Sequence, residues 1–336
     1  KKIKIEDALI KILSSPNHSN KNWVTSQYDQ MVMCDTVQKS GSDAAIIRIH
    51  NKDKAIAVSV DSSANYCKSY PLTGGKQIVC ENWRNLISVG AKPLAITNCL
   101  NFGNPENQEI MGEFAECLEG VKEACNFLNY PVVSGNVSFY NGTNKKNIYP
   151  TPVIGGVGLI KKLSKPLSHN FKQANSTIIL IGKTFGHIEQ SCYLKENYSI
   201  TDGMPPEINL LNEKNNGENL LKLIDKNLIL SAHDISNGGL ITALSEMTLT
   251  SDFGAKIYKP KKLTNLFKYF FGEDQARYII EIQTQKLPIV EKILKESNIY
   301  YENIGLTQEN YFEIEGELKI STKDLFKINN QWYSNY

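Results

Sequence analysis

Apolar positions along the chain alternate between two spacings, one typical of helices and one typical of strands. Steps of three and four predict helices over these segments: 3–14, 74–90, 110–128, 240–247 and 288–297. Short β-branched and apolar runs bounded by Gly, Pro, Asn or Asp predict strands over these: 44–49, 55–60, 94–97, 131–133, 153–160, 176–181, 228–230 and 277–282, with a hairpin in 311–320. Alternating strands and helices indicate an α/β chain.

A breaker-rich segment interrupts this pattern near the middle of the chain. Lys161 to Pro166 separates two stretches that each begin with strands and continue into helices. With 336 residues the chain is long enough for two α/β units. We therefore expect subdomains at 1–162 and 163–336.

The charge balance argues against a nucleic-acid partner. Lys plus Arg number 37 and Asp plus Glu 35, so the net charge is +2. That is too little for gripping a phosphate backbone by charge alone. Only three of the basic residues are arginine, so an anion site must rely mainly on lysines, backbone amides and helix ends.

Hydropathy and cysteine usage predict a cytoplasmic protein. No run of about 18 apolar residues is present, and the amphipathic amino terminus does not resemble a secretion signal. The seven cysteines are odd in number and contain no Cys-x-x-Cys pair, which argues against a disulfide framework or a zinc cage. We expect neither a membrane nor an extracellular location.

Polar residues gather where the predicted strands end. Asp61 follows the first strong strand, Asn98 and Asn101 follow the second, and Asn136 and Ser138 follow the third. Ligands of α/β sheets bind beyond the carboxyl ends of strands, so these side chains could converge on one crevice. The alternative is that each simply forms a turn.

Three other constellations could meet a phosphate or a cation. Gly74-Gly75-Lys76 at a predicted helix start offers amides and an ammonium, although a capping role fits equally well. His233-Asp234, before Gly238-Gly239, suits phosphate or hydrated Mg²⁺ better than zinc, or is a capped turn. Glu273-Asp274-Gln275 could bind Mg²⁺ or solvate a turn. From residues alone, the chain is a nucleotide- or phosphate-binding α/β protein whose particular reaction stays open.

Taken together, the motifs resemble those of phosphoribosylformylglycinamidine (FGAM) synthase, within the aminoimidazole ribonucleotide (AIR) synthetase superfamily. The resemblance runs in order from about Ser14 to Ile282. It rests on these segments: Tyr28-Asp29-Gln30, Asp43-Ala44-Ala45, Tyr70-Pro71 with Gly74-Gly75-Lys76, Leu100-Asn101-Phe102-Gly103-Asn104-Pro105, Val132 to Ser138, Pro150-Thr151-Pro152, His233-Asp234 with Gly238-Gly239-Leu240, and Phe271-Gly272-Glu273.

The resemblance is to the carboxyl-terminal half of the small-type synthetase subunit. It implies one copy of an AIR synthetase-like fold, with a barrel-forming amino-terminal subdomain, of the kind used for dimerisation, and a carboxyl-terminal α/β sandwich. It implies ATP- and Mg²⁺-dependent conversion of formylglycinamide ribonucleotide to the amidine in purine biosynthesis. The γ-phosphate of ATP activates the amide oxygen and ammonia displaces the phosphate. Implied partners are the amino-terminal half, a glutaminase subunit and a small accessory subunit.

Site roles follow from the same resemblance. Asn98 and Gly135 correspond to ATP contacts, Asn136 to a Mg²⁺ ligand and Ser138 to a substrate contact. Asn98 replaces an aspartate that is usual in the family. Catalytic groups are expected in the amino-terminal half, and these residues are assigned to an auxiliary nucleotide site: His233, Asp234, Glu273, Asp274 and Gln275.

Two alternatives remain open. The chain could be a non-catalytic nucleotide-binding module that forms a homodimer, as single-copy relatives do. It could also be a stand-alone enzyme similar to AIR synthetase, although the Asn-Phe-Gly-Asn-Pro and Gly-Asn-Val-Ser runs favour the FGAM branch.

Overall fold

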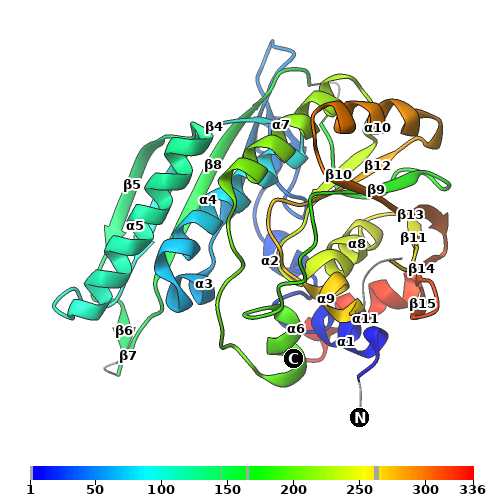
Figure 1. The fold of residues 1–336 in the computed structure, drawn as a ribbon. Coiled ribbons are helices and arrows are strands. Elements are labelled where there is room, and N and C mark those ends of the chain that lie inside the picture. The colour runs from blue at the N-terminus through cyan, green and yellow to red at the C-terminus, as the bar shows by residue number, and fades with distance from the viewer. Residues whose placement is uncertain (1–2, 145, 164–165, 261–264) are drawn as a thin grey trace.

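Two large sheets organise the chain (Figure 1). The structure is a computed structural model that describes residues 3–144, 146–163, 166–260 and 265–336. The first sheet has the order β1-β2-β3-β8-β4-β5, with these bounds: β1 Thr36–Gln38, β2 Ala45–Arg48, β3 Ala55–Asp61, β8 Thr151–Ile160, β4 Lys92–Asn101 and β5 Val132–Ser138. Its neighbours are antiparallel except for the parallel pair β4 and β5. A separate two-stranded ribbon joins β6 (Gly142–Thr143) to β7 (Lys146–Asn147).

The second sheet is built from the later part of the chain. Its order is β10-β12-β9-β13-β11-β14-β15, and only β11 and β14 pair in parallel. The bounds are β9 Thr177–Ile181, β10 Ser231–Asp234, β11 Phe253–Ile257, β12 Tyr278–Ile282, β13 Tyr301–Glu309, β14 Tyr311–Ile314 and β15 Leu318–Ser321.

The helices fall into two groups (Figure 1). On the side where the two sheets meet lie α3 (Ala64–Ser69), α4 (Pro71–Ser88), α5 (Gln108–Leu128), α7 (Leu210–Asp225) and α10 (Leu287–Glu296). On the far face of the second sheet lie α1 (Ile5–Leu13), α6 (Cys192–Tyr198), α8 (Gly239–Leu249), α9 (Leu266–Phe271) and α11 (Thr322–Ser334). Short turns complete the description: α2 (Asn22–Thr25) and two 3₁₀ turns, Val32–Cys34 and Thr284–Lys286.

Helix α4 is the centre of the first hydrophobic core. Its Ile78, Trp83 and Ile87 belong to one cluster with residues of both sheets, among them Ile46 of β2 and Ile179 of β9. Side chains of a strand alternate between faces, so Ile178 and Leu180 point the other way, into the second core. Burying α4 between the sheets therefore connects the two halves of the chain.

The first residues of the chain belong to the second core. Ile5, Leu9 and Ile12 of α1 are buried with Leu244 of α8 and Ile178 of β9. The part of the chain before residue 163 thus supplies a helix to the later half. A subdomain boundary at 162/163 falls between the two sheets, and we keep it as a proposal.

Most predicted elements are confirmed, with shifted ends. The hairpin of β2 and β3, helix α5, and strands β8, β9 and β12 lie where the sequence predicts them. The polar run after residue 97 was predicted to be a turn, but β4 continues through it to Asn101. The strand predicted at 228–230 is wrong, since β10 begins at Ser231. Both errors occur where polar residues form strands because a neighbouring strand supplies their hydrogen bonds.

Gly74-Gly75-Lys76 does not form a phosphate loop or a cap. Helix α4 begins at Pro71, so these three residues lie inside it. A Cβ on Gly75 would overlap the backbone carbonyl of Cys117 in α5. Lys76 pairs with Glu123 of α5 at 2.5 Å. The glycines therefore allow α4 to approach its neighbouring helices closely.

The first sheet is open within the described residues, with β1 and β5 at its edges. Helices α4 and α5 cover one face (Figure 1), while Ile47, Ile56, Val60 and Val157 are exposed on the other. All seven cysteines lie in the described part of the chain and are free. None of the described helices is both long enough and apolar enough to cross a membrane.

The α4–α5 contact predicts opposite effects for two glycines of the same helix. A Cβ on Gly120 of α5 would overlap the carbonyl of Leu72, whereas one on Gly112 would meet nothing within 4 Å. We expect Gly120→Ala to lower the free energy of unfolding by about 1–3 kcal/mol through overpacking. Gly112→Ala should raise it by about 0.5–1 kcal/mol, because alanine is the better helix former.

Urea unfolding of the two variants measures both effects. Equal effects at the two positions would show that close packing of α4 against α5 is not what Gly120 provides.

Candidate functional site

Three of the predicted strand-end residues share one row on the first sheet. Asp61 of β3 lies opposite Ile154 of β8, Ile154 lies opposite Asn98 of β4, and Asn98 lies beside Gly135 of β5. Residues paired across strands point to the same face, and Ile154 is fully buried on the helix-covered face. Asp61, Asn98 and Gly135 therefore face α4 and α5.

Asn98 and Gly135 are in direct contact. A Cβ at position 135 would overlap the Asn98 side-chain oxygen, so only glycine lets the Asn98 amide lie against β5. Asn98 also lines a hollow of about 410 Å³ together with Lys122, Tyr130 and Val132. The two predicted ATP contacts are thus brought together beside a cavity.

Asn136 and Ser138 lie on the opposite face. They pair with Cys99 and Asn101, one and three positions beyond Asn98 on β4, so alternation turns them toward the open side of the sheet. Asn136 is exposed. The Ser138 hydroxyl lies 3.1 Å from the amide nitrogen of Asn141. The strand-end residues therefore form two groups on two faces, and one crevice cannot hold all of them.

Asp61 is held by helix α4. Its carboxylate accepts hydrogen bonds from Asn82 Nδ2 at 2.7 Å, Asn85 Nδ2 at 2.8 Å and Ser59 Oγ at 2.9 Å. Burial raises the pKa of Asp61 to about 7, and the nearby Glu81 carboxylate adds to the shift. Two close carboxylates with amide oxygens beside them are the hard donor set that Mg²⁺ prefers. Asp61 and Glu81 fit that ion better than exposed Asn136 does by itself.

Arg84 of α4 is fully buried and connects α4 to the second half of the chain. Its Nη1 donates to Glu213 Oε1 of α7 at 2.7 Å, and its Nη2 donates to Gln275 Oε1 at 2.8 Å. Its Nε lies 3.5 Å from Asp234 Oδ2. A buried guanidinium must be paired and hydrogen-bonded, and these three partners satisfy it.

His233 and Asp234 end β10 beside this arginine. Burial raises the pKa of Asp234 to about 8 against the opposing charge of Arg84, and the neighbouring Asp43 carboxylate adds to the rise. His233 Nε2 lies 3.1 Å from Glu246 Oε2. Although burial lowers the pKa of His233, the Asp43 and Glu246 carboxylates hold it well above its ordinary value.

Glu273 and Asp274 bind backbone groups. Glu273 Oε1 accepts the N–H groups of Cys192 and Gly238, each at 2.7 Å. Asp274 accepts three successive N–H groups from Phe185, Gly186 and His187, at 2.8 to 3.0 Å. These contacts fix the loops around β10 and β12. With Gln275 bound to Arg84, the three residues hold the wall of the predicted auxiliary site, whose use by a nucleotide stays a proposal.

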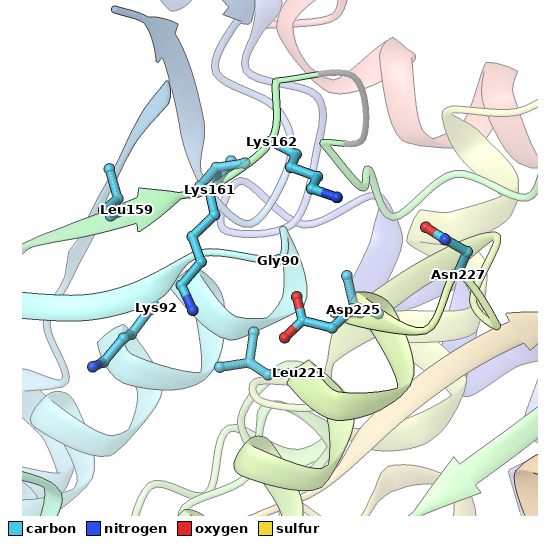
Figure 2. Close-up of a pocket in the computed structure, with 10 residues that line it drawn as sticks. Gly90, Lys92, Leu159, Lys161, Lys162, Leu221, Asp225 and Asn227 are labelled. Carbon is cyan, nitrogen blue, oxygen red and sulfur yellow. The ribbon is translucent and has the colours of Figure 1, made fainter. Parts of the chain in front are cut away.

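A second groove lies away from all of these residues. It encloses about 360 Å³ between the Gly90 turn, the end of β8 and the end of α7. Figure 2 shows Lys92, Lys161 and Lys162 around it with Asp225. None of the residues predicted as site residues lines this groove.

The sequence analysis missed the polar residues inside α4. Glu81, Asn82, Arg84 and Asn85 are all buried, although they occur within a helix predicted from its apolar stripe. Their signal is that polar residues of α4 also recur at helical spacing, which marks a second face that contacts polar groups.

The raised carboxyl pKa values predict how stability depends on pH. A carboxyl whose pKa is higher in the folded state binds its proton more tightly there, so stability falls as pH rises from the unfolded value toward the folded one. For Asp234 this range runs from 3.8 to about 8. We expect the free energy of unfolding to fall between pH 5 and pH 8. Asp234→Asn should reduce that fall by at least about 1 kcal/mol.

Chemical denaturation at a series of pH values measures the fall, and Asp252→Asn, at an exposed position, is the matched control. Parallel curves for the wild type and Asp234→Asn would contradict the account of this carboxyl.

Comparison with known proteins agrees with this fold. Residues 41–160 match the family described as AIR synthase related protein, N-terminal domain, and residues 173–314 match its C-terminal domain. The subunit PurL of phosphoribosylformylglycinamidine synthase from Pelagibacter ubique is 54% identical over the whole chain, which covers 46% of that protein. The chain thus spans about half the length of the curated relatives it matches.

Solved structures share the fold. Thermotoga maritima PurL complexed with FGAR matches 97% of the chain, and 54% of its own length, with a TM-score of 0.78 at 14% identity. T. maritima PurL complexed with AMPPCP matches 86% of the chain, and 42% of its own length, with a TM-score of 0.60 at 25% identity. Sequence and fold together show that the chain belongs to the AIR synthase related family.

Proposed function

We propose that the chain is the carboxyl-terminal half of an FGAM synthase subunit and contributes one wall of its ATP site. The observation that carries this proposal is full-length similarity at 54% identity to about half of a subunit of that name. The reaction converts formylglycinamide ribonucleotide to the amidine with ammonia derived from glutamine. ATP supplies the phosphoryl group that activates the amide oxygen. The residues of this chain bind and orient, and the catalytic groups belong to the other half.

The wall of the ATP site consists of Asn98 and Gly135. The bare backbone of Gly135 and the Asn98 amide lie together at the hollow between β5 and α5, where a neutral amide both donates and accepts hydrogen bonds. A relative with 25% identity is described as complexed with the ATP analogue AMPPCP. Nucleotide binding at this edge of the sheet is consistent with both observations.

On the open face, Asn136 and Ser138 are accessible to a substrate or an ion held by a second chain. Asn136 offers one neutral oxygen, so a Mg²⁺ ion there would need carboxylates from the partner. The carboxylates of Asp61 and Glu81 are the alternative Mg²⁺ ligands within this chain. We therefore assign Asn136 to a shared site and Asp61 with Glu81 to the auxiliary one.

The exposed apolar face of the first sheet is where the amino-terminal half would bind. Ile47, Ile56, Val60 and Val157 are 36–67% exposed on neighbouring strands of an open sheet. Covering such a face removes apolar surface from water. A homodimer through this face is the alternative. A glutaminase subunit, a small accessory subunit and a cytoplasmic location complete the proposal, and the relatives are themselves named as subunits.

Reconstitution tests this function. We expect the chain, mixed with the amino-terminal half of the P. ubique subunit, to form the amidine from formylglycinamide ribonucleotide, ATP, Mg²⁺ and ammonium. Product and ADP are measured by chromatography. Asn136→Ala and Ser138→Ala should lower kcat/KM at least about tenfold, since each removes a polar contact of the reacting complex. Asn126→Ala, at an exposed position of α5, should leave it unchanged.

Three other outcomes would overturn the proposal. Amidine formation by the chain alone would indicate a stand-alone enzyme. Binding of ADP with Mg²⁺ in calorimetry, without turnover by the reconstituted pair, would indicate a non-catalytic nucleotide-binding module. Loss of activity in Asn126→Ala equal to that in Asn136→Ala would show that the assigned residues have no special role.

A further inference from the structure

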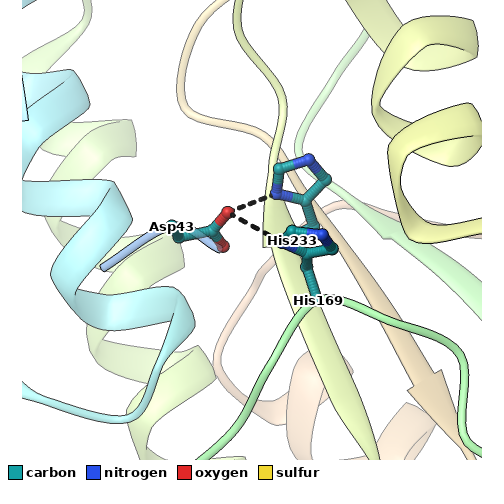
Figure 3. A group of neighbouring side chains, drawn as sticks. All are labelled: Asp43, His169 and His233. Atoms are coloured by element: carbon teal, nitrogen blue, oxygen red, sulfur yellow. Dashed lines mark ion pairs between the residues drawn. The ribbon is translucent and has the colours of Figure 1, made fainter. Parts of the chain in front are cut away.

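Three side chains from distant parts of the sequence meet beside β10. Asp43 precedes β2, His169 lies in the segment before β9, and His233 belongs to β10. Each offers a ligand atom, and these atoms lie within 4.8 Å of one another. Figure 3 shows the Asp43 carboxylate facing both imidazole rings, whose centroids are 4.8 Å apart.

The cluster is buried and incompletely hydrogen-bonded. His169 is 6% exposed and His233 8%, and the Asp43 side chain is 3% exposed. Asp43 Oδ2 and His169 Nδ1 have no hydrogen-bond partner, and His233 Nδ1 lies 2.6 Å from Asp43 Oδ1 without making a well-formed hydrogen bond. Buried polar atoms are nearly always paired, so three such atoms facing one point call for a missing partner.

The outer contact of His233 is the one that metal-binding histidines make. Its Nε2 lies 3.1 Å from Glu246 Oε2, which leaves Nδ1 as the nitrogen that faces the cluster. A histidine that ligates a metal usually donates its other ring N–H to a carboxylate, which fixes the tautomer and the ring orientation. Glu246 is placed to do this.

We propose that Asp43, His169 and His233 bind a divalent transition metal ion, with Zn²⁺ the first candidate. Two imidazole nitrogens and one carboxylate oxygen suit zinc better than Mg²⁺, which prefers oxygen ligands alone. The sequence near Asp234 contains a single histidine, and His169 supplies the second nitrogen from 64 positions away. This inference does not depend on the proposed function.

The spacing fits a small adjustment. Ligand atoms of a tetrahedral zinc site lie about 3.3 Å apart when each bond is about 2.0 Å. Asp43 Oδ1 is 2.6 Å from His233 Nδ1 and 3.7 Å from His169 Nδ1, so both pairs need to move by well under 1 Å. Asp234 Oδ1, 3.9 Å from His233 Nδ1, or a water molecule can complete the coordination.

Charge also favours a cation at this point. The Asp43, Asp234 and Glu246 carboxylates lie around the two rings, and among them only Asp234 is paired with an arginine. A divalent ion would offset this excess, and it would link the segment before β2 to β10 of the second sheet.

Metal analysis of the full chain tests the proposal. After treatment with EDTA, protein incubated with Zn²⁺ and desalted should retain about one Zn²⁺ per chain by mass spectrometry, and Zn²⁺ should raise Tm where Mg²⁺ does not. His169→Asn should retain less than about a tenth of that zinc. Glu246→Gln should weaken Zn²⁺ binding about 10–100-fold. His50→Ala, at a partly exposed histidine paired with Asp35, should bind as the wild type does.

A second measurement covers poor folding of the buried variants and a different zinc site. His18 and Cys192 lie 3.2 Å apart and could themselves hold a metal. Co²⁺ bound at the proposed site should give a visible spectrum without the near-ultraviolet band of a thiolate ligand, and Cys192→Ala should not change it. The proposal is overturned if the wild type retains no Zn²⁺, if a folded His169→Asn binds as the wild type does, or if the Co²⁺ spectrum shows thiolate.

Discussion

The buried guanidinium of Arg84 is the interaction on which the arrangement of the two halves depends. It extends from the middle of α4 and reaches α7, β10 and the segment before β12 through Glu213, Asp234 and Gln275. A charge without contact to water is tolerated only when its partners are correctly placed. The first sheet, which packs on α4, is thereby held at one orientation to the second sheet.

This constraint also sets the electrostatics of the site. Asp61 and Asp234 lie on opposite sides of α4 at the level of Arg84, and burial raises the pKa of each carboxyl toward or above neutrality. Such carboxyls can take up a proton or a cation at neutral pH. The loops that enclose them are fixed separately, because Glu273 and Asp274 bind backbone N–H groups. A rigid frame thus surrounds groups whose charge can change.

The sequence predicts what depends on local pattern. Helix α5 follows from its regular apolar spacing, and the hairpin of β2 and β3 from two apolar runs around a polar turn. It predicts Asn98 and Gly135 as one site because they end neighbouring strands. It does not predict that Asn136 faces the other side, since the extent of β5 decides that and depends on pairing with β4.

Features that depend on contacts between distant segments could not be predicted. Gly75 is indistinguishable from a phosphate-loop glycine until α5 is seen against it. Arg84 lies inside an ordinary helical pattern, and its partners are more than 100 positions away. His169 lies in an irregular segment and gains meaning only next to His233. The family resemblance supplies roles for residues, but not the packing that makes those roles available.

A double-mutant cycle on Arg84 and Glu213 tests the central claim most directly. Arg84→Met and Glu213→Leu should each lower the free energy of unfolding at pH 7 by about 3–5 kcal/mol, because each leaves a buried charge uncompensated. The double variant should lose far less than the sum, since Asp234, whose pKa is about 8, can remain protonated. Single losses that add to within about 0.5 kcal/mol would show that the two side chains act independently. That result would contradict the role of Arg84 in holding the two halves together.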